Sequence, residues 1–466
     1  MLTQTLDPTG LAQQLQGTAI APGDARYDDA RRVWNGMIDR RPALIARCAG
    51  PEDVAACLAF ARAHDLPVAV RGGGHNVAGS AVCDDGLVID LSPMKAVEVD
   101  PAARRVRAGG GVTIGELDRA TVPHGLAVPM GVVTETGIAG LTLGGGFGWQ
   151  TRKHGLACDA LRAAEVVTAD GRLLRASADE HPDLFWALRG GGGNFGVVTA
   201  FEFEAYPIEP EVFLLATFYP SSEAQRVLAA AQAFLADAPE AFSAIGVLGH
   251  VPPADAIPAE HHGAPMIALV GAYVGDAEEG ARTLAPLRRL ATPYADLSGP
   301  TPFLEVQQFF DADYPRGGRY YWKSTKLAHL PAEAVEALVA LNDAAPSAHS
   351  TLDVWLTSGG AAARVPAEGT AFGDRSTPFM IGVEANWHDA ADDEANVAWA
   401  RRCIAEMAPY AAGGSYLNFP GFAEEGEGMV RAALGANYGR LQAIKAKYDP
   451  GNVFRTHQNI RPAEAA

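Results

Sequence analysis

The stretch "AVRGGGHNVAGSAV", residues 69–82, places three consecutive glycines directly before His75 and Asn76. The apolar run at residues 66–70 predicts a short buried strand, so the glycines fall where that strand ends. Glycine tolerates positive φ and lets the main chain approach a ligand closely. Consecutive bare N–H groups after a strand can bind phosphate oxygens. By itself the stretch is equally consistent with a tight turn that carries a surface histidine.

The composition indicates an ordinary globular protein with large buried cores. A chain of 466 residues with 48% hydrophobic content has room for two or three domains. A net charge of −18 argues against nucleic acid and anionic membranes as partners, because both need a basic face. We expect a cytoplasmic protein, because no stretch has the pattern of a signal peptide or the length of a transmembrane span. The five cysteines are scattered, which indicates small buried residues and neither a disulfide framework nor a metal site.

The first two hundred residues predict an α+β pattern. Residues 50–67 carry apolar positions at helical spacing and have acids in the first turn, and residues 86–91 indicate a strand. Thr113 and Glu116 have the spacing of a capping box that opens the next helix. Residues 160–176 are typical of a hairpin with its turn at Asp-Gly, and a long strand is expected over residues 196–208.

A change in composition marks a second domain. From Val212 to about Tyr410 the glycine clusters thin out and alanine-rich helices alternate with strands. The acidic stretch 423–430 is expected to be a loop before a final helix that carries Leu434 and Tyr448. The expected divisions are an N-terminal segment 1–35, domains 36–210 and 211–412, and a C-terminal segment 413–466.

Two further glycine clusters lie in the first domain. Residues 191–196, "GGGNFG", satisfy G-x-G-x-x-G, but the β-branched run that follows argues against a dinucleotide-binding turn, which needs a helix there. Residues 144–149, "GGGFGW", follow another stretch rich in glycine and small residues. So much glycine favours backbone packed against something flat or phosphorylated, with packing against another strand as the alternative.

Taken together, the motifs resemble one known family. They are "RGGGHN" at 71–76, "GLTLGGGFGWQTRKHGLACDAL" at 141–162, "DLFWALRGGGGNFGVVT" at 183–199, "SYLNFPG" at 415–421 and "YGRLQAIKAKYDPGNVF" at 438–454. The chain resembles flavoproteins of the vanillyl-alcohol-oxidase type, and within them the berberine-bridge-enzyme-like oxidases, including the bacterial hydroxynicotine oxidases. The resemblance implies a two-part FAD-binding domain over 36–210, a substrate domain with an antiparallel sheet covered by helices, and a C-terminal segment that returns to the flavin.

The resemblance also implies how the cofactor is held. The loop from Arg71 to Asn76 would wrap the FAD pyrophosphate, and His75 would bond covalently to the 8α-methyl of the flavin. Relatives with a second covalent bond carry a cysteine where this chain has Val133, so only one bond is expected. The residues expected to contact FAD are Arg71, Gly72, Gly73, Gly74, His75, Asn76, Ser80, Val133, Thr134, Gly137, Gly140, Gly144, Val198 and Asn418.

The expected catalytic residues depart from the plant pattern. Plant relatives carry a tyrosine where this chain has Phe147, which cannot accept a proton. The resemblance makes Tyr416 a candidate base, with simple packing as the alternative. Strand periodicity puts Glu384 on one face with Met380, so it is the second candidate, and a solvated or ion-paired carboxylate is the alternative. Tyr321 shares a face with a lysine two residues on, although a core aromatic stripe is favoured there.

The expected reaction is oxidation of a small molecule by FAD. A base, Tyr416 or Glu384, would take a proton from an alcohol or amine while the adjacent carbon gives hydride to flavin N5, and molecular oxygen would then give hydrogen peroxide. The alternatives are a dehydrogenase with another electron acceptor, a reductase fed by NADPH, and a flavin-binding protein without turnover. The sequence leaves the substrate and the oligomeric state open.

Overall fold

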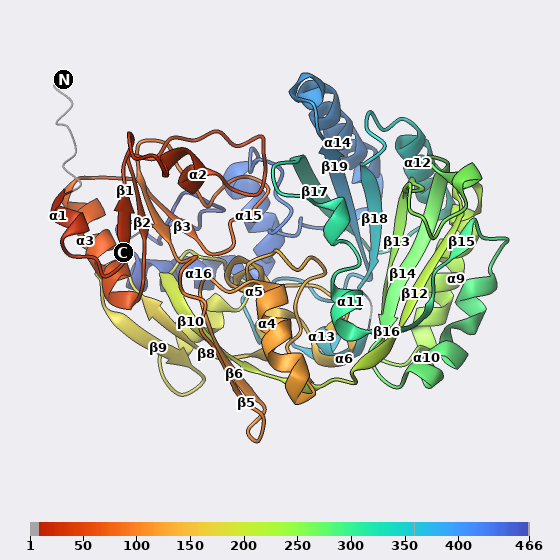
Figure 1. Ribbon diagram of the computed structural model, residues 1–466, viewed down its shortest axis with the longest axis horizontal. Coiled ribbons are helices and arrows are strands. Elements are labelled where there is room, and N and C mark those ends of the chain that lie inside the picture. The colour runs from red at the N-terminus through yellow and green to blue at the C-terminus, as the bar shows by residue number, and fades with distance from the viewer. Residues whose placement is uncertain (1–8, 358, 465–466) are drawn as a thin grey trace.

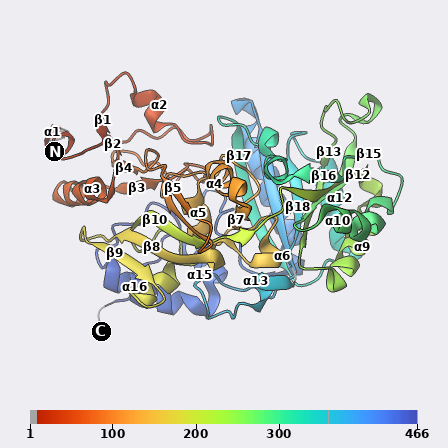
Figure 2. The same ribbon diagram turned by 60° about the horizontal axis from the view of Figure 1, so that its bottom comes forward.

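The computed structural model describes residues 9–357 and 359–464, so the ends of the expected segments 1–35 and 413–466 lie outside the described residues. Two halves lie side by side (Figures 1 and 2). One half holds the elements up to residue 207 together with the last two helices, and the other holds a large sheet with its covering helices. The expected α+β class is confirmed.

A four-stranded sheet carries the glycine loop. Its strand order is β1 Thr18–Ile20, β2 Leu44–Arg47, β4 Leu87–Asp90 and β3 Val68–Arg71. Strands β2, β4 and β3 are parallel. Helix α3 Pro51–Ala63 begins at a proline and buries Val54, Cys57 and Leu58 against this sheet, which confirms the helix expected there. Residues 72–76 therefore leave the end of β3, as the apolar run before them indicated.

A second, antiparallel sheet follows. Its order is β5 Val97–Asp100, β6 Arg105–Gly109, β10 Val197–Glu204, β8 Leu161–Val167 and β9 Leu173–Ser177. The pairing of β8 with β9 confirms the expected hairpin. The strand expected over 196–208 is interrupted, because β10 ends at Glu204 and Ala205 lies between two strands, although its N–H still bonds to the Arg104 carbonyl in register with the pairing of β10 and β6. The next residues form β11 Tyr206–Pro207, which pairs with β7 Leu126–Ala127.

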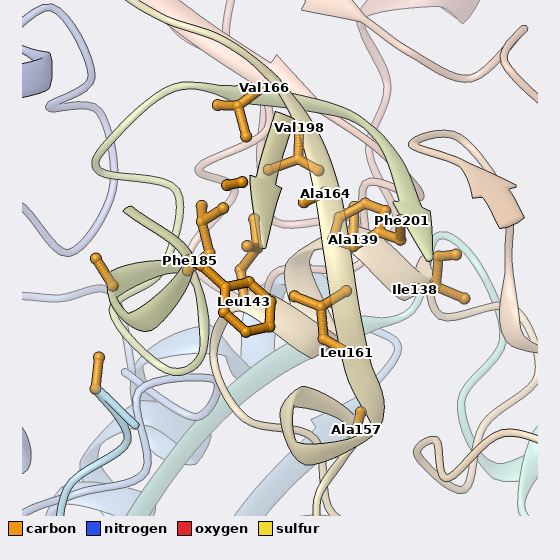
Figure 3. Close-up of a cluster of buried hydrophobic side chains, with 14 of the residues drawn as sticks. Ile138, Ala139, Leu143, Ala157, Leu161, Ala164, Val166, Phe185, Val198 and Phe201 are labelled. Atoms are coloured by element: carbon orange, nitrogen blue, oxygen red, sulfur yellow. The ribbon is translucent and has the colours of Figure 1, made fainter. Parts of the chain in front are cut away.

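The C-terminal helices complete the core of this half. The acidic stretch 423–430 is not a loop throughout, because α15 Gly426–Leu434 begins inside it. Glu427 forms an ion pair with Arg431, while Val430 is buried in the core. Helix α16 Tyr438–Tyr448 is separate from α15, so Leu434 does not belong to the final helix. Figure 3 shows the central part of the same core, where Phe185, Leu161 and Phe201 gather.

The second half is built on a nine-stranded antiparallel sheet. Its order is β15 Ala295–Asp296, β12 Glu211–Pro220, β14 Pro265–Tyr273, β13 Phe242–His250, β18 Thr351–Leu356, β19 Phe379–Trp387, β17 Arg319–Leu327 and β20 Ala411–Gly413, and β16 Gly299–Pro302 also pairs with β12. One face packs against α9 Ala224–Asp237, α10 Ala277–Leu284, α12 Ala332–Asp343 and α14 Asp393–Met407. The other face meets the first half, because its strand residues share a core with Trp34 and Val133.

The remaining helices are short and lie mainly in the first half and in the connections. They are α1 Thr9–Ala12, α2 Tyr27–Arg31, α4 Ile114–Thr121, α5 Ile138–Leu143, α6 Thr151–His154, α7 Ala157–Ala160, α8 Pro182–Leu188, α11 Phe303–Gln307 and α13 Gly360–Arg364. Glu116 accepts the Thr113 N–H at 2.8 Å, as expected for the start of α4. Within residues 9–357 and 359–464, no helix has the length and apolar character needed to cross a membrane. All five cysteines are buried and free.

Candidate active site

A cavity of about 280 Å³ lies where the two halves meet. The first half lines it mainly with glycines and small residues, while β17, β18 and β19 contribute Trp322, Asp353, Trp355, Met380 and Glu384, and β13 contributes Ile245. Among the residues that the sequence singled out, those that line the cavity are Gly72, Gly73, Gly74, His75, Asn76, Ser80, Val133, Gly137, Gly140, Gly144, Val198, Asn418, Tyr416 and Glu384.

The glycine loop touches a second glycine segment through bare backbone. A Cβ added to Gly73 would lie 2.4 Å from the Gly137 nitrogen, and one added to Gly137 would lie 2.3 Å from the Gly73 nitrogen. Gly74 has a φ of +71°, in the region that favours glycine. Gly73 and Gly137 require glycine because a side chain would collide with main chain rather than with a movable group, whereas Gly74 favours glycine because of its positive φ.

His75 is held by an aromatic stack. Its ring lies 4.0 Å from the Trp34 ring at 19°, and Trp34 stacks in turn on Tyr320 at 3.8 Å. The Trp34 indole N–H donates to the Tyr314 carbonyl at 3.0 Å, which fixes the stack. Burial lowers the pKa of His75 to about 3, so the imidazole is neutral at physiological pH. His75 Nε2 finds no hydrogen-bond partner in the described part of the chain.

Two carboxyl groups face the cavity from adjacent strands. Glu384 of β19 and Asp353 of β18 are diagonal neighbours, because Glu384 pairs with Thr351 and Asp353 pairs with Gly382. Tyr314 Oη donates to Glu384 Oε2 at 2.6 Å. Burial and the neighbouring Asp353 raise the pKa of Glu384 well above its usual range, and burial raises the pKa of Asp353 to about 7. The two groups are therefore expected to share a proton near neutral pH.

Tyr416 is tied to the backbone of the first half. Its Oη accepts the Gly146 N–H at 3.0 Å and an Asn418 Nδ2–H at 2.8 Å. Burial raises its pKa above the usual range. Its ring also packs edge-to-face on Phe147 at 5.1 Å. Tyr416 is thus a neutral phenol in a fixed position, and both lone pairs of its oxygen are already engaged.

Three groups named from the sequence do not line the cavity. Arg71 donates to the Ala30 carbonyl at 2.5 Å. Thr134 donates from N and Oγ1 to Asp311, at 2.7 and 2.5 Å, and so joins the two halves. Tyr321 and the neighbouring lysine point to the other face of β17, where Tyr321 bonds to Glu424, in agreement with the favoured reading that they are not catalytic.

Sequence reasoning missed several residues of the cavity. Asp353 and Trp355 could have been predicted from the sequence, because they lie two residues apart in a largely apolar strand and therefore on the same face of it. Tyr314 and His457 carried none, since only the tertiary fold brings them to the cavity, and the same holds for Trp34, which stacks on His75 without lining the cavity. His457 lines the cavity with an unpartnered Nε2 among the described residues, and burial lowers its pKa to about 4.

These features fit FAD. Bare N–H groups at residues 72–76 suit a pyrophosphate, and the imidazole nitrogens of His75 and His457 are buried polar atoms that still need partners. The small residues of segments 137–144 and 191–198 leave room for a flat ring system beside the main chain. In the described ranges, no cluster of three or more His, Cys, Asp or Glu residues is placed to hold a metal ion.

Comparison with known proteins agrees with this fit. Residues 42–177 match the family model described as an FAD binding domain, and residues 415–461 match the model described as "Berberine and berberine like". The (R)-6-hydroxynicotine oxidase of Paenarthrobacter nicotinovorans is 32% identical over 96% of this chain and 97% of its own length.

Solved structures give the same result. The crystal structure of 6-hydroxy-D-nicotine oxidase from Arthrobacter nicotinovorans superposes with a TM-score of 0.85 at 30% identity, over 99% of this chain and 100% of that one. Glucooligosaccharide oxidase from Acremonium strictum, described as carrying a 6-S-cysteinyl, 8α-N1-histidyl FAD, shares the fold with a TM-score of 0.84 at 24% identity, over 96% of this chain and 98% of that one. The matches run over nearly the whole length, and the chain belongs to the berberine-bridge-enzyme-like FAD-linked oxidoreductases.

Proposed function

We propose that the protein is an oxidase that removes hydride from an alcohol or amine carbon, with FAD as the hydride acceptor and oxygen as the final electron acceptor. The observation that carries this proposal is that one cavity holds both the glycine-rich FAD cradle with His75 and the buried acids Asp353 and Glu384. An FAD oxidase needs this combination, because a proton must leave the substrate heteroatom when its carbon loses hydride.

The FAD would be held by main-chain N–H groups and one covalent bond. Residues 72–76 would bind the pyrophosphate, and the neutral His75 imidazole would attach to the flavin. Bound FAD supplies a hydride acceptor at N5 and passes two electrons to oxygen to form hydrogen peroxide. Val133 lines the cavity and has no thiol, so the second bond named for glucooligosaccharide oxidase has no counterpart here.

Glu384 is the proposed proton acceptor. Its side chain faces the cavity and accepts a hydrogen bond from Tyr314. Because the nearby Asp353 raises the pKa of Glu384, the carboxyl pair can accept a proton and thereby lose negative charge in an apolar site. Tyr416 suits a different role. Its oxygen accepts two N–H bonds, and its own O–H remains free to donate to a substrate or to the cofactor.

Two measurements test this function. Holoenzyme mixed without oxygen with a panel of alcohols, amines and sugars should lose its flavin colour with at least one of them, and with oxygen it should form one peroxide per substrate oxidised. Reduction that is reoxidised only by an added dye would make the protein a dehydrogenase. For the tether, acid-precipitated wild-type protein should stay yellow and His75→Ala should release all its flavin; a yellow His75→Ala pellet would contradict the attachment.

A further inference from the structure

Two of the five sequence motifs, residues 183–199 and 438–454, meet at one buried ion pair. Lys445 of α16 and Asp449, just past the end of this helix, are both 0% exposed, and their charged atoms lie 2.6 Å apart. Replacing a buried ion pair by apolar residues is often neutral or even stabilising, because two charges must leave water to form it. The stability of the fold is therefore a weak explanation for a lysine at this position.

The ammonium group of Lys445 joins three parts of the chain. Its Nζ donates to the Asp449 carboxylate at 2.6 Å, to the Asn194 carbonyl at 2.8 Å and to the Phe454 carbonyl at 2.9 Å. An ammonium group has three N–H donors, so all of them are used. Asp449 also accepts the N–H groups of Val453 and Phe454, at 2.8 and 2.9 Å. The ion pair thus fixes the chain where it continues beyond α16.

The side chain of Asn194 connects the same parts a second time. It is 1% exposed and donates to the Gly191 carbonyl at 2.9 Å and to the Gln458 carbonyl at 3.1 Å. It also accepts the Ile460 N–H at 2.9 Å. Asn194 is therefore bonded to the C-terminal part of the chain through both its side chain and its carbonyl.

Both of the connected segments are walls of the cavity that fits FAD. Residues 191–194 line it, and so do residues 454, 456–458 and 460. None of these residues belongs to a helix or a strand, so no backbone ladder sets the distance between the two walls. Among the described residues, every hydrogen bond between segments 191–196 and 453–460 involves Asn194. The separation of the walls is thus set by Lys445, Asp449 and Asn194, which we name the Lys445 junction.

We propose that Lys445 is a positioning residue for FAD, which holds segments 191–196 and 453–460 at the separation that the bound cofactor needs. Lys445 does not line the cavity itself, so it acts through the main chain of Asn194 and Phe454, which do line it. Asp449 supplies the negative charge that lets the ammonium group stay buried. This role concerns retention of FAD, and it would be the same in a flavin-binding protein without turnover.

The rate at which FAD leaves the protein tests this role. In the His75→Ala background, where FAD is expected to be held without a covalent bond, the holoenzyme is diluted into flavin-free buffer. The rise in free-FAD fluorescence then gives the rate constant for release. Lys445→Met keeps the length of the side chain and removes its three donors. It should release FAD about 10- to 100-fold faster, the range expected for losing hydrogen bonds to a charged group.

Two further variants protect the test against a simple loss of folding. Lys445→Met alone leaves Asp449 as an unpaired buried charge, which is strongly destabilising. Lys445→Met combined with Asp449→Asn leaves no charge behind. Asn194→Ala keeps the ion pair and removes only the side-chain bonds to the C-terminal segment and to Gly191. Both variants should also release FAD faster than the His75→Ala parent.

Two controls separate positioning from stability. Lys447→Met removes a lysine of the same helix, whose ion pair with Asp183 is partly exposed and reaches neither wall, and its release rate should stay within about twofold of the parent. Leu338→Ala truncates a fully buried side chain in the core of the other half. It lowers the stability of the protein but should leave the release of FAD from folded chains unchanged.

A second readout does not depend on the histidine bond. In the background that keeps His75, the flavin-to-protein ratio of the purified protein should fall in the junction variants and stay at the wild-type value in both controls. The visible circular dichroism of the bound flavin, which reports its fixed orientation, should change in the junction variants only.

Release rates are compared among variants whose circular dichroism and thermal unfolding show a folded chain. The proposal is overturned if folded Lys445→Met and Asn194→Ala variants release FAD at the parent rate, or if Leu338→Ala accelerates release as much as Lys445→Met does. Failure of all three junction variants to fold would also overturn it, because the junction would then be a requirement of the fold itself. None of these outcomes depends on substrate oxidation, so the oxidase function can fail while this inference stands.

Discussion

At the residue scale, the sequence left open whether Glu384 or Tyr416 is the base, and we expect it to be Glu384. Glu384→Gln keeps the volume and the contact with Tyr314 but cannot accept a proton. The rate of flavin reduction by a substrate should fall about 10²- to 10⁴-fold, as for loss of a general base. Tyr416→Phe should lower this rate much less, because the tyrosine oxygen accepts its bonds from Gly146 and Asn418.

Stopped-flow measurement of flavin reduction without oxygen compares the two variants directly. The same traces give the apparent affinity for substrate, which separates a loss of binding from a loss of chemistry. A larger loss of rate for Tyr416→Phe than for Glu384→Gln would reverse the assignment and make the tyrosine the base.

A substitution at Val133 tests whether this residue occupies the position from which relatives form a second covalent bond to the flavin. It is 9% exposed and lines the cavity. Val133→Cys introduces a slightly smaller side chain, which the fold should tolerate at a cost of about 1 kcal/mol. If Val133 faces the flavin, part of the flavin should become bonded to this cysteine, so that His75→Ala in the same background no longer frees all of it.

Peptide mapping of Val133→Cys, with and without His75→Ala, detects the new bond. The neighbouring Val132→Cys, which also lines the cavity, is the matched control for a thiol one position away. Flavin bonded only through His75 in the single variant, and fully released in the double variant, would show that residue 133 does not face the flavin ring.

At the element scale, the segment 131–137 is held to the second half by a short 3-10 turn, Asp311–Asp313. Asp311 accepts both the N–H and the hydroxyl of Thr134. Asp311→Ala leaves this N–H without its partner, so the free energy of unfolding should fall by about 1–3 kcal/mol. Urea unfolding of the holoenzyme, followed by circular dichroism, measures the difference.

A second contact of segment 131–137 with the second half supplies the control. Arg316 and Glu135 form an ion pair with both side chains more than a third exposed. Such pairs contribute about 0–1 kcal/mol, so Arg316→Ala should change the unfolding free energy much less than Asp311→Ala. Equal losses would mean that the Thr134 contact contributes no more than an exposed ion pair.

Elements differ in how far the sequence predicts them. The hairpin at 160–176 was predictable because its turn and its pairing are both local. The start of α15 was not, because acidic residues suggest a solvated loop, whereas Val430 and Leu434 are drawn into a core made by distant strands and helices. The break between β10 and β11 was also missed, since it depends on the pairing of Tyr206 and Pro207 with β7, a strand far earlier in the chain.

At the scale of the whole molecule, the contact between α4 and α11 predicts a pH dependence of stability. Asp118 of α4 accepts a bond from Gln307 of α11 at 3.0 Å, and burial raises its pKa to about 7. The carboxyls at Asp313 and Asp353 have pKa values raised to about 6 and 7. At these carboxyls the folded state therefore holds more protons than the unfolded chain between about pH 4 and pH 7, whereas at His75 and His457, whose pKa values are lowered by burial, it holds fewer below about pH 6.5.

The contribution of each of these carboxyls to stability should accordingly fall as the pH rises through this window and level off above it, and the difference between wild type and a variant isolates one group from the opposing histidines. Each such group contributes a slope of about 1.4 kcal/mol per pH unit. Asp118→Asn should flatten the dependence and raise the unfolding free energy at pH 8 relative to wild type. Urea unfolding at pH 5 and pH 8, with Asp343→Asn as the control, checks this; an unchanged slope in Asp118→Asn would show that Asp118 is ionised in the folded state.

The sequence by itself determined the family, the class of cofactor and most of the FAD cradle. The glycines before His75 were readable from the sequence, because Gly74 has a positive φ and Gly73 approaches the backbone of Gly137, and both requirements leave glycine as the residue at that position. The expected positions from Gly72 to Asn76 accordingly line the cavity. Glu384 could be named for a similar reason, since strand periodicity assigns a face from spacing alone.

Only the tertiary structure decided what surrounds the reacting atoms. Trp34, Tyr314 and Asp353 come from three distant parts of the chain, and none is adjacent in sequence to the residue it serves. In the structure neither Arg71 nor Thr134 lines the cavity: Arg71 donates from one guanidinium nitrogen to the Ala30 carbonyl, and Thr134 donates to Asp311. The physical reason is that burial and charge coupling depend on what the folded chain places within a few ångströms, and spacing along the sequence does not contain that distance.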